Sequence, residues 1–391
     1  MSKRPAISLI GEDACTGCFL CGDVCLKKAI EFRLDETGFY KPYVDANSCN
    51  GCGLCAASCP VITSEYSRDL KPKPDVYGGW SNDEQIRLNS SSGGIFYEFA
   101  KRVIEDGGVV CGVRWKSGKV EFDMVDEICA LQGLMGSKYL QADATGIYAK
   151  VKKIVKEGRR VLFVGLPCQV QALSNYVKSE LLYTVDLVCA GVPSVLMFNR
   201  YCEEYFPGET VTEVKFRVKN LSDSCRTISS WKNYSIEYYS KDKLLLSQEH
   251  CKDPYFLAFN SAKCYNTACY ECSLNTYPRR GNMSFCDYWG AKGDMDCEKG
   301  TSLLLVNDSK GDAFYERYVK NDSNLFFRSI IDDTPIKGTP RLDMKRRSMP
   351  KERSLIFESL KERGFAPMYN KYIKPSFMKK VTNVLKNIFE K

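Results

Sequence analysis

Eight cysteines in two closely spaced runs are the residues of this chain whose types and spacing most directly suggest chemistry. The runs are CTGCFLCGDVC, from Cys15 to Cys25, and CNGCGLCAASCP, from Cys49 to Pro60. Each has the spacing C-x2-C-x2-C-x3-C. Three cysteines separated by two residues can wrap around one face of a cuboidal [4Fe–4S] cluster, and the fourth points toward a neighbouring cluster. The spacing therefore predicts two clusters.

The same spacing, which is that of bacterial two-cluster ferredoxins, predicts how the two clusters share their ligands. The ligands expected for the first cluster are Cys15, Cys18, Cys21 and Cys59. The ligands expected for the second cluster are Cys49, Cys52, Cys55 and Cys25. Glycines in the runs (Gly17, Gly51 and Gly53) reduce crowding where backbone amides approach the sulfides. Zinc is disfavoured because it takes two pairs of ligands on separate knuckles.

The cysteine total supports metal or redox chemistry rather than disulfides. The chain has 391 residues and 20 cysteines, and its start, MSKRPAISLIGEDAC, lacks the apolar segment of a secretory signal. We therefore expect a cytoplasmic protein, whose thiols stay reduced. The longest apolar stretch, Leu181 to Phe198, is interrupted by Asp186 and Pro193, so no transmembrane segment is predicted.

The net charge of +8 is a weak indicator of partners. Lys and Arg total 56 against 48 Asp and Glu, and the basic residues are scattered except near the end of the chain. Each all-cysteine cluster carries about −2 with its thiolates, which offsets much of the excess. The charge does not support nucleic-acid binding and at most suits an acidic electron donor.

Strand and helix patterns alternate after the cysteine runs and predict an α/β fold with a largely parallel sheet. Helices are expected within 93–106, 145–156 and after Pro167, and strands over 109–115, 160–165 and 181–189. Residues 211–250 predict antiparallel strands instead. The expected organisation is a two-cluster ferredoxin-like domain (1–63), a linker with two prolines (64–76), a larger mixed α/β domain (77–340) and a basic helical tail (341–391).

The end of the tail, SFMKKVTNVLKNIFEK, has an apolar stripe between lysines. Packing of this helix on the protein's own body is the favoured interpretation. Peripheral contact with a membrane surface is the alternative.

Four further cysteines are placed by the predicted fold so that they could meet. Cys168 follows one strand and Cys189 ends the next, so a parallel pairing brings both to one edge of the sheet. Cys269 and Cys272 form a C-x2-C pair that could close a third [4Fe–4S] site. The spacing alone leaves open whether these are ligands or structural thiols, and Cys264 is a substitute ligand.

The segment NSSSGGIF, from Asn89 to Phe96, precedes a helix and offers hydroxyls and free backbone N–H groups to a phosphate. Plain N-capping is the simpler interpretation. No GxGxxG follows a strand and no P-loop occurs, so neither nucleotide motif is supported. The single histidine, His250, lies in a polar segment and is interpreted as a surface residue.

The ordered segments SSSGGIF, GGVVCGVRW, GSKYLQAD, VLFVGLPCQVQAL, TVDLVCAGVPS, ACYEC and GNMSFCDYWG resemble the family of coenzyme F420 hydrogenase/dehydrogenase beta subunits, in the form with an N-terminal two-cluster module. The resemblance covers roughly residues 10–295. It implies FAD and a third cluster on Cys168, Cys189, Cys269 and Cys272. It also implies flavin contacts from Ser91, Ser92, Gly93, Gly94, Lys138 and Tyr139.

The chain departs from the family at three places. Ala190 stands where many relatives have histidine, Cys286 stands where glycine or alanine precedes Asp287, and FRVK replaces FRDK. The lost histidine and acid weaken any inherited proton-transfer role. Lys138 and Asp287 remain as candidate catalytic groups that tune the flavin, with loop capping the alternative for Asp287.

The resulting hypothesis is an oxidoreductase that passes electrons between a ferredoxin or similar low-potential carrier and FAD, to reduce or oxidise a small organic or deazaflavin substrate. Surface-polysaccharide metabolism is one setting that the family implies. The alternatives are a non-catalytic electron-transfer subunit of a larger hydrogenase or dehydrogenase, and an iron–sulfur redox sensor.

Overall fold

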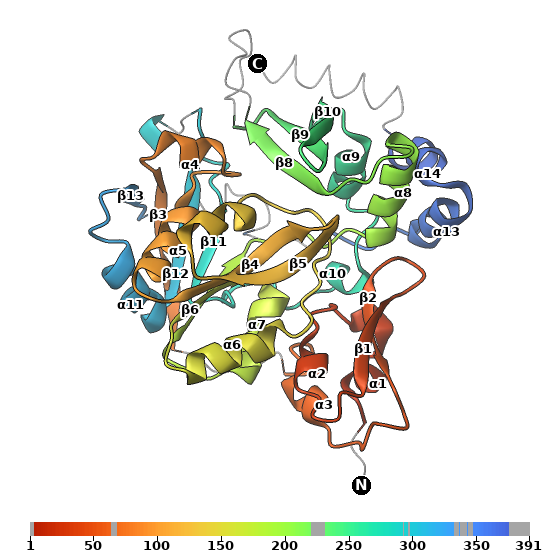
Figure 1. Ribbon diagram of the computed structural model, residues 1–391, viewed down its shortest axis with the longest axis horizontal. Coiled ribbons are helices and arrows are strands. Elements are labelled where there is room, and N and C mark those ends of the chain that lie inside the picture. The colour runs from red at the N-terminus through yellow and green to blue at the C-terminus, as the bar shows by residue number, and fades with distance from the viewer. Residues whose placement is uncertain are drawn as a thin grey trace.

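The computed structural model describes residues 4–63, 69–219, 231–291, 293–295, 298–331, 336, 342 and 347–374 (Figure 1). The cysteine-rich N-terminal module contains α1 (Ala6–Ala14), α2 (Leu20–Asp23) and α3 (Leu54–Ser58). It also has a hairpin of β1 (Ile30–Leu34) and β2 (Tyr40–Val44). It lies at one end of the molecule, against α6 and α7 of the larger domain.

An eight-stranded sheet forms the centre of the larger domain, in the order β13-β3-β12-β11-β7-β6-β4-β5. Its strands are β3 (Leu70–Ser81), β4 (Val109–Lys116), β5 (Lys119–Val125), β6 (Val161–Gly165), β7 (Leu182–Leu187), β11 (Met283–Asp287), β12 (Ser302–Asp308) and β13 (Leu325–Ser329). The four central strands β11, β7, β6 and β4 are parallel.

The prediction of a largely parallel sheet is therefore wrong for its flanks. β12, β3 and β13 pair antiparallel beyond β11, and β5 forms a hairpin with β4 at the other edge. β3 comes early in the chain and β12 and β13 come late, so no local pattern reveals that they pair.

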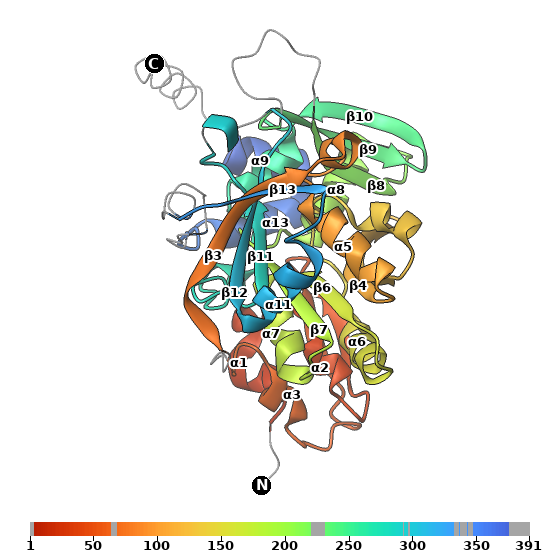
Figure 2. The same cartoon turned by 90° about the vertical axis from the view of Figure 1, so that its left-hand side faces the viewer.

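Helices cover both faces of the sheet (Figure 2). One face packs on α5 (Ile95–Glu105), η1 (Ile128–Leu134) and α11 (Ser309–Tyr318) through one apolar cluster. The other packs on α6 (Ile147–Lys156) and α7 (Pro167–Tyr176) through a second cluster. Phe19, Leu20 and Phe39 of the N-terminal module belong to this second cluster, so the module shares the core of the larger domain.

The prediction of a linker over 64–76 is wrong from Leu70 onward, because β3 begins there. The two prolines suggested a break because proline cannot donate to a β-ladder. In the structure, Leu70 pairs with Asp308 and Asp75 with Val306, with an irregular register between them. Pro72 and Pro74 lie in that irregularity and so interrupt no regular ladder. Residues 64–68 lie outside the described part of the chain.

A second, three-stranded antiparallel sheet confirms the expectation for 211–250. It consists of β8 (Glu213–Lys219), β9 (Tyr234–Ser240) and β10 (Lys243–Glu249). The helices α8 (Val195–Tyr205) and α9 (Pro254–Asn260) share its apolar core. The shorter helices elsewhere are α4 (Glu84–Leu88), α10 (Thr267–Tyr270) and η2 (Gly293–Met295).

The described end of the chain folds as α13 (Arg353–Arg363), α14 (Phe365–Met368) and the π-helical η3 (Tyr369–Ile373). Ile356, Phe357 and Phe365 join the main core, so this part of the tail packs on the body. The amphipathic helix expected at its end lies outside the described residues. Among the described residues, no helix has the length and apolar character needed to cross a bilayer.

Candidate functional site

The two cysteine runs fold into loops with the same backbone conformation. Gly17 and Gly51, in matching positions, have φ of 65° and 63°. Phe19 and Gly53, two residues later, have φ of 72° and 78° and lie at the N-caps of α2 and α3. A Cβ on Gly17 would lie 2.8 Å from the carbonyl oxygen of Tyr40, so a side chain is excluded there. The loops fit the close backbone approach that a cluster requires.

The four cysteines predicted for the first cluster lie around one small cavity of about 20 Å³. Its lining includes Cys15, Cys18, Cys21 and Cys59. Burial raises the pKa of Cys18 to about 12, and the charges of Cys59 and Cys15 add to the rise. Buried in this way, the thiols stay neutral unless a metal group binds them as thiolates.

The cysteines predicted for the second cluster differ in exposure. Cys55 is buried, Cys25 and Cys49 are half-buried, and Cys52 is exposed. Backbone N–H groups point at two of these sulfurs: Ala6 donates to Cys55 and Ala29 to Cys25, each at 3.4 Å. No disulfide joins any of the cysteines that the structure describes. Within the described residues, no three His, Cys, Asp or Glu side chains form a single-ion site.

The third group of cysteines meets at the carboxyl ends of parallel strands, as the sequence predicts. Cys168 lies in the first turn of α7, directly after β6, and Cys189 follows β7. Burial raises the pKa of the Cys168 thiol well above its ordinary range, and the charges of Cys272, Cys18, Cys189 and Cys269 raise it further. The four predicted thiols therefore lie near one another and near the first cluster's Cys18. Cys264, the substitute ligand, is fully buried in the main apolar core.

A buried polar network contacts this group of cysteines at the backbone of Cys189. Asn275 donates to the carbonyl oxygen of Cys189 at 2.6 Å and accepts from Arg279 at 2.8 Å. Arg279 in turn pairs with Asp186 at 3.1 Å, and both side chains are fully buried. The network therefore holds the backbone at Cys189.

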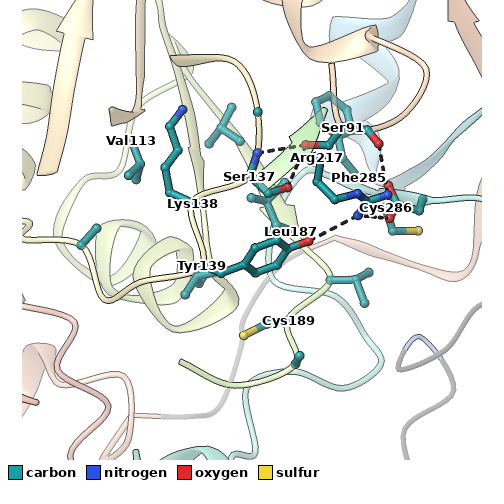
Figure 3. Close-up of a pocket in the computed structure, with 18 of the residues that line it drawn as sticks. Ser91, Val113, Ser137, Lys138, Tyr139, Leu187, Cys189, Arg217, Phe285 and Cys286 are labelled. Carbon is teal, nitrogen blue, oxygen red and sulfur yellow. Dashed lines mark hydrogen bonds and ion pairs between the residues drawn. The ribbon is translucent and has the colours of Figure 1, made fainter. Parts of the chain in front are cut away.

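A cavity of about 660 Å³ opens beside these cysteines (Figure 3). Its walls come from segments far apart in the sequence: Thr16 and Gly17, the Ser-Gly loop at 90–94, residues 134–142, Cys168, and the loop from Leu187 to Pro193. Arg217, Tyr234, His250, Asp287 and Trp289 close another side. Its volume lies in the range of about 300–1,000 Å³ that is common for organic ligands.

The Ser-Gly loop is anchored to the sheet and presents part of itself to the cavity. Ser91, Ser92 and Gly94 line the cavity, whereas Gly93 packs against β3 and β12. The hydroxyl of Ser92 donates to the carbonyl oxygen of Thr301 at 2.7 Å. The Ser91 and Ser137 hydroxyls lie 3.0 Å apart. Gly94 has φ of 87° at the N-cap of α5, so it both starts this helix and turns the loop toward the cavity.

Arg217 organises the polar side of the cavity (Figure 3). It comes from β8, pairs with Asp287 at 3.0 Å and donates to the hydroxyl of Tyr139 at 3.3 Å. It also donates to the carbonyl oxygen of Ser91 at 3.2 Å, and its guanidinium lies over the ring of Tyr234. Arg217 is not among the residues predicted from the sequence. The FRVK segment drew attention for the acid it lacks rather than for its arginine.

Lys138 lines the same cavity but its side chain points away from Arg217, toward Val113 (Figure 3). Its amino group donates to the carbonyl oxygens of Met135 at 2.6 Å and Gly133 at 3.2 Å. Burial lowers the pKa of Lys138 to about 7. The structure thus places Lys138 at the site with its amino group bound to the turn after η1.

The interpretation of His250 as a surface residue is wrong. His250 lines the cavity, is half-buried and stacks on Tyr234 with ring centroids 4.2 Å apart. Burial lowers the pKa of His250. The polar sequence around it follows from its position just after β10, where neighbouring residues are exposed.

Known proteins resemble both parts of this arrangement. Residues 158–326 match the family model for the C terminus of the "Coenzyme F420 hydrogenase/dehydrogenase, beta subunit", and residues 14–62 match "4Fe-4S dicluster domain". The F subunit of the F(420)H(2) dehydrogenase of Methanosarcina mazei is 24% identical over 194 residues, 46% of this chain and 54% of that protein. The ferredoxin-type protein NapF of Escherichia coli is 49% identical over 61 residues, 14% of this chain and 37% of that protein.

The chain therefore spans about half the length or less of these curated relatives. Among solved structures, a chain of the F420-reducing [NiFe] hydrogenase complex from Methanosarcina barkeri is similar, with 14% identity and a TM-score of 0.46. The similarity covers 78% of this chain and 93% of that one. Residues 158–326 of the chain therefore resemble the C-terminal region of coenzyme F420 hydrogenase/dehydrogenase beta subunits, and residues 14–62 form an N-terminal 4Fe–4S dicluster domain.

Proposed function

We propose that this protein is an iron–sulfur flavoprotein oxidoreductase that relays electrons between a ferredoxin-type carrier and an organic or deazaflavin substrate in the cytoplasm. One observation carries the proposal. A single cavity is lined by Thr16 and Gly17 between the first cluster's cysteines, by Cys168 and Cys189, and by the Ser-Gly loop. Groups suited to one-electron carriers and a pocket for an organic cofactor thus lie side by side.

A third [4Fe–4S] cluster on Cys168, Cys189, Cys269 and Cys272 would join the dicluster domain to the cavity. The charges of Cys272, Cys18, Cys189 and Cys269 all act on the Cys168 thiol, which supports this assignment. The neighbour Cys18 belongs to the first cluster, so the two groups are close. Exposed Cys52, in the second cluster's run, suits the entry point for electrons from the carrier.

FAD fits the cavity by size and by the chemistry of the walls. Ser91, Ser92 and Gly94 offer hydroxyl and backbone groups near the N-terminus of α5, which suit a phosphate. Arg217 offers guanidinium N–H donors beside the half-buried Asp287, and Tyr139 offers a hydroxyl. Bound FAD would accumulate electrons singly and exchange them in pairs with a substrate. Arg217 would hold Asp287 and Tyr139 in place and orient the ligand.

Metal and flavin analysis of anaerobically purified protein tests the proposal. We expect about twelve iron atoms and one FAD per chain from three [4Fe–4S] clusters. Cys168→Ser should remove about four iron atoms and leave the dicluster spectrum intact. Cys202→Ser is the matched control, because Cys202 is equally half-buried but does not line the cavity, and it should keep all iron. About eight iron atoms or no flavin in the unaltered protein would refute the proposal.

A second candidate is a non-catalytic electron-transfer subunit, since one relative is itself described as part of a dehydrogenase. It predicts stable co-purification with a larger partner and no substrate turnover by this chain alone. An iron–sulfur redox sensor, in contrast, predicts no flavin.

A further inference from the structure

A buried lysine lies between the first cluster's cysteines and those proposed for the third cluster. Lys41 is on β2 and is 7% exposed. Its ammonium group donates to the carbonyl oxygens of Glu12 at 2.7 Å and Cys15 at 2.9 Å, and to Oδ1 of Asn266 at 3.0 Å. Asn266 is fully buried and is the N-cap residue of α10, the helix that carries Cys269.

All three acceptors are uncharged oxygens. Among the described residues, no carboxylate forms an ion pair with Lys41. Burying an ammonium group without a counter-charge is unfavourable even when its N–H groups are satisfied. Hydrogen bonding therefore explains the orientation of Lys41. It does not explain why a positive charge is buried between the two groups of cysteines.

Thiolate groups on both sides are the available counter-charges. On one side the ammonium group of Lys41 is bonded to the carbonyl oxygen of Cys15. On the other side it is bonded to Asn266, whose own carbonyl oxygen accepts from the backbone N–H of Cys269 at 2.9 Å. An all-cysteine [4Fe–4S] cluster carries about −2 with its ligands and gains one more negative charge on reduction. A buried cation stabilises the more negative, reduced form because the surroundings screen it weakly.

We infer that Lys41 is an electrostatic positioning residue for electron transfer. Its charge raises the reduction potentials of the first cluster and the third cluster together, so both clusters accept an electron from the carrier more readily. Asn266 holds the ammonium group between the two groups of cysteines. It accepts a hydrogen bond from Lys41 and donates one to the Cys15 carbonyl oxygen at 3.2 Å. The inference about the third cluster rests on the proposed function. The inference about the first rests on the dicluster domain alone.

The test is an anaerobic redox titration of the holoprotein, followed by electron paramagnetic resonance, with iron and sulfide content measured on each sample. Lys41→Gln removes the charge and keeps a hydrogen-bonding side chain. We expect the first and third clusters to shift to lower potential, with the reduced-to-oxidised ratio at a fixed potential falling about tenfold, or ~59 mV for one electron. The second cluster should shift less, and Lys41→Arg should keep values near those of the unaltered protein.

A second variant covers the case in which Lys41→Gln fails to hold its clusters. Asn266→Asp keeps the shape of the side chain and pairs the ammonium with a carboxylate, so it should lower the same two potentials without removing the lysine. Lys27→Gln is the matched control, because Lys27 is exposed near Cys25 and water screens its charge. It should shift no cluster.

Unchanged potentials in both Lys41→Gln and Asn266→Asp, with full iron content, would overturn the inference. Equal shifts in Lys27→Gln would do the same, since they would indicate a general charge effect. If the unaltered protein holds about eight iron atoms, the proposed function fails and the role at the third cluster fails with it. The shift of the first cluster still tests the charge of Lys41 in that case.

Discussion

The hydroxyl of Tyr148 donates a hydrogen bond of 2.6 Å to the carbonyl oxygen of Cys18. Tyr148 lies on α6 of the larger domain, and Cys18 lies in the first cysteine loop. Tyr148 is fully buried, and its ring packs near Phe163 of β6. The bond thus joins α6, which packs on the sheet, to the loop with the first cluster's cysteines, near Cys168. It therefore holds the N-terminal module against the larger domain between the first cluster's loop and Cys168.

Tyr148→Phe should therefore destabilise the protein without removing a cluster ligand. The substitution leaves the buried carbonyl oxygen of Cys18 without its donor, which costs about 1–3 kcal/mol. Anaerobic urea unfolding measures the change, and the iron content should stay unaltered. Tyr43→Phe is the control, since Tyr43 is 51% exposed and its replacement should change stability by less than about 0.5 kcal/mol. Equal stability of the two variants would contradict the role of the bond.

Much of the site was predictable because its signals are local. The cysteine spacing is a property of two short loops, and Cys168 and Cys189 follow from a single strand–helix–strand unit. The contribution of β8 to the cavity was not predictable, since Arg217 reaches Asp287 across 70 residues of sequence. Similarly, only the folded chain shows that Lys41 of the N-terminal module meets Asn266. The residues next to Arg217 and Lys41 in the sequence do not indicate that these side chains have such distant partners.

Gly93→Ala should disturb the Ser-Gly loop. A Cβ at this position would lie 2.5 Å from the carbonyl oxygen of Gly79 and 2.7 Å from the backbone nitrogen of Ser302. Backbone atoms cannot move aside as a side chain can, so we expect a loss of about 1–3 kcal/mol in unfolding free energy. If FAD binds here, flavin content should fall as well. Gly112→Ala is the control for stability alone, because its Cβ would meet Leu134 at an ordinary 3.5 Å. A Gly93→Ala protein as stable as the control would show that the loop is not tightly held.

Arg279→Met should destabilise the fold and loosen the proposed third cluster. The substitution leaves the fully buried Asp186 without its cationic partner, and breaking a buried pair in this way costs about 3–5 kcal/mol. It also removes the donor to Asn275, which holds the Cys189 carbonyl oxygen. Iron content should fall toward that of Cys168→Ser. Arg363→Met, at an exposed position on α13, should leave both stability and iron content unchanged. If Arg279→Met is destabilised but keeps its full iron content, the polar network is not needed to hold the third cluster.

Lys138 should make stability depend on pH in a defined window. Burial lowers its pKa in the folded protein to about 7, whereas the ordinary value is 10.5. Between these values the unfolded chain binds more protons than the folded chain, so the free energy of unfolding rises with pH. One proton contributes at most about 1.4 kcal/mol per pH unit.

Comparison of the unaltered protein with Lys138→Met isolates this contribution from those of other groups. The unaltered protein should gain stability relative to Lys138→Met as the pH rises from about 7 toward 10.5, and the difference should be constant below pH 7. Anaerobic urea unfolding at several pH values measures it. Lys119→Met, at an exposed position, should follow the unaltered protein throughout. A constant difference across the whole window would mean that Lys138 keeps an ordinary pKa, because its bonds to the carbonyl oxygens of Met135 and Gly133 then outweigh its burial.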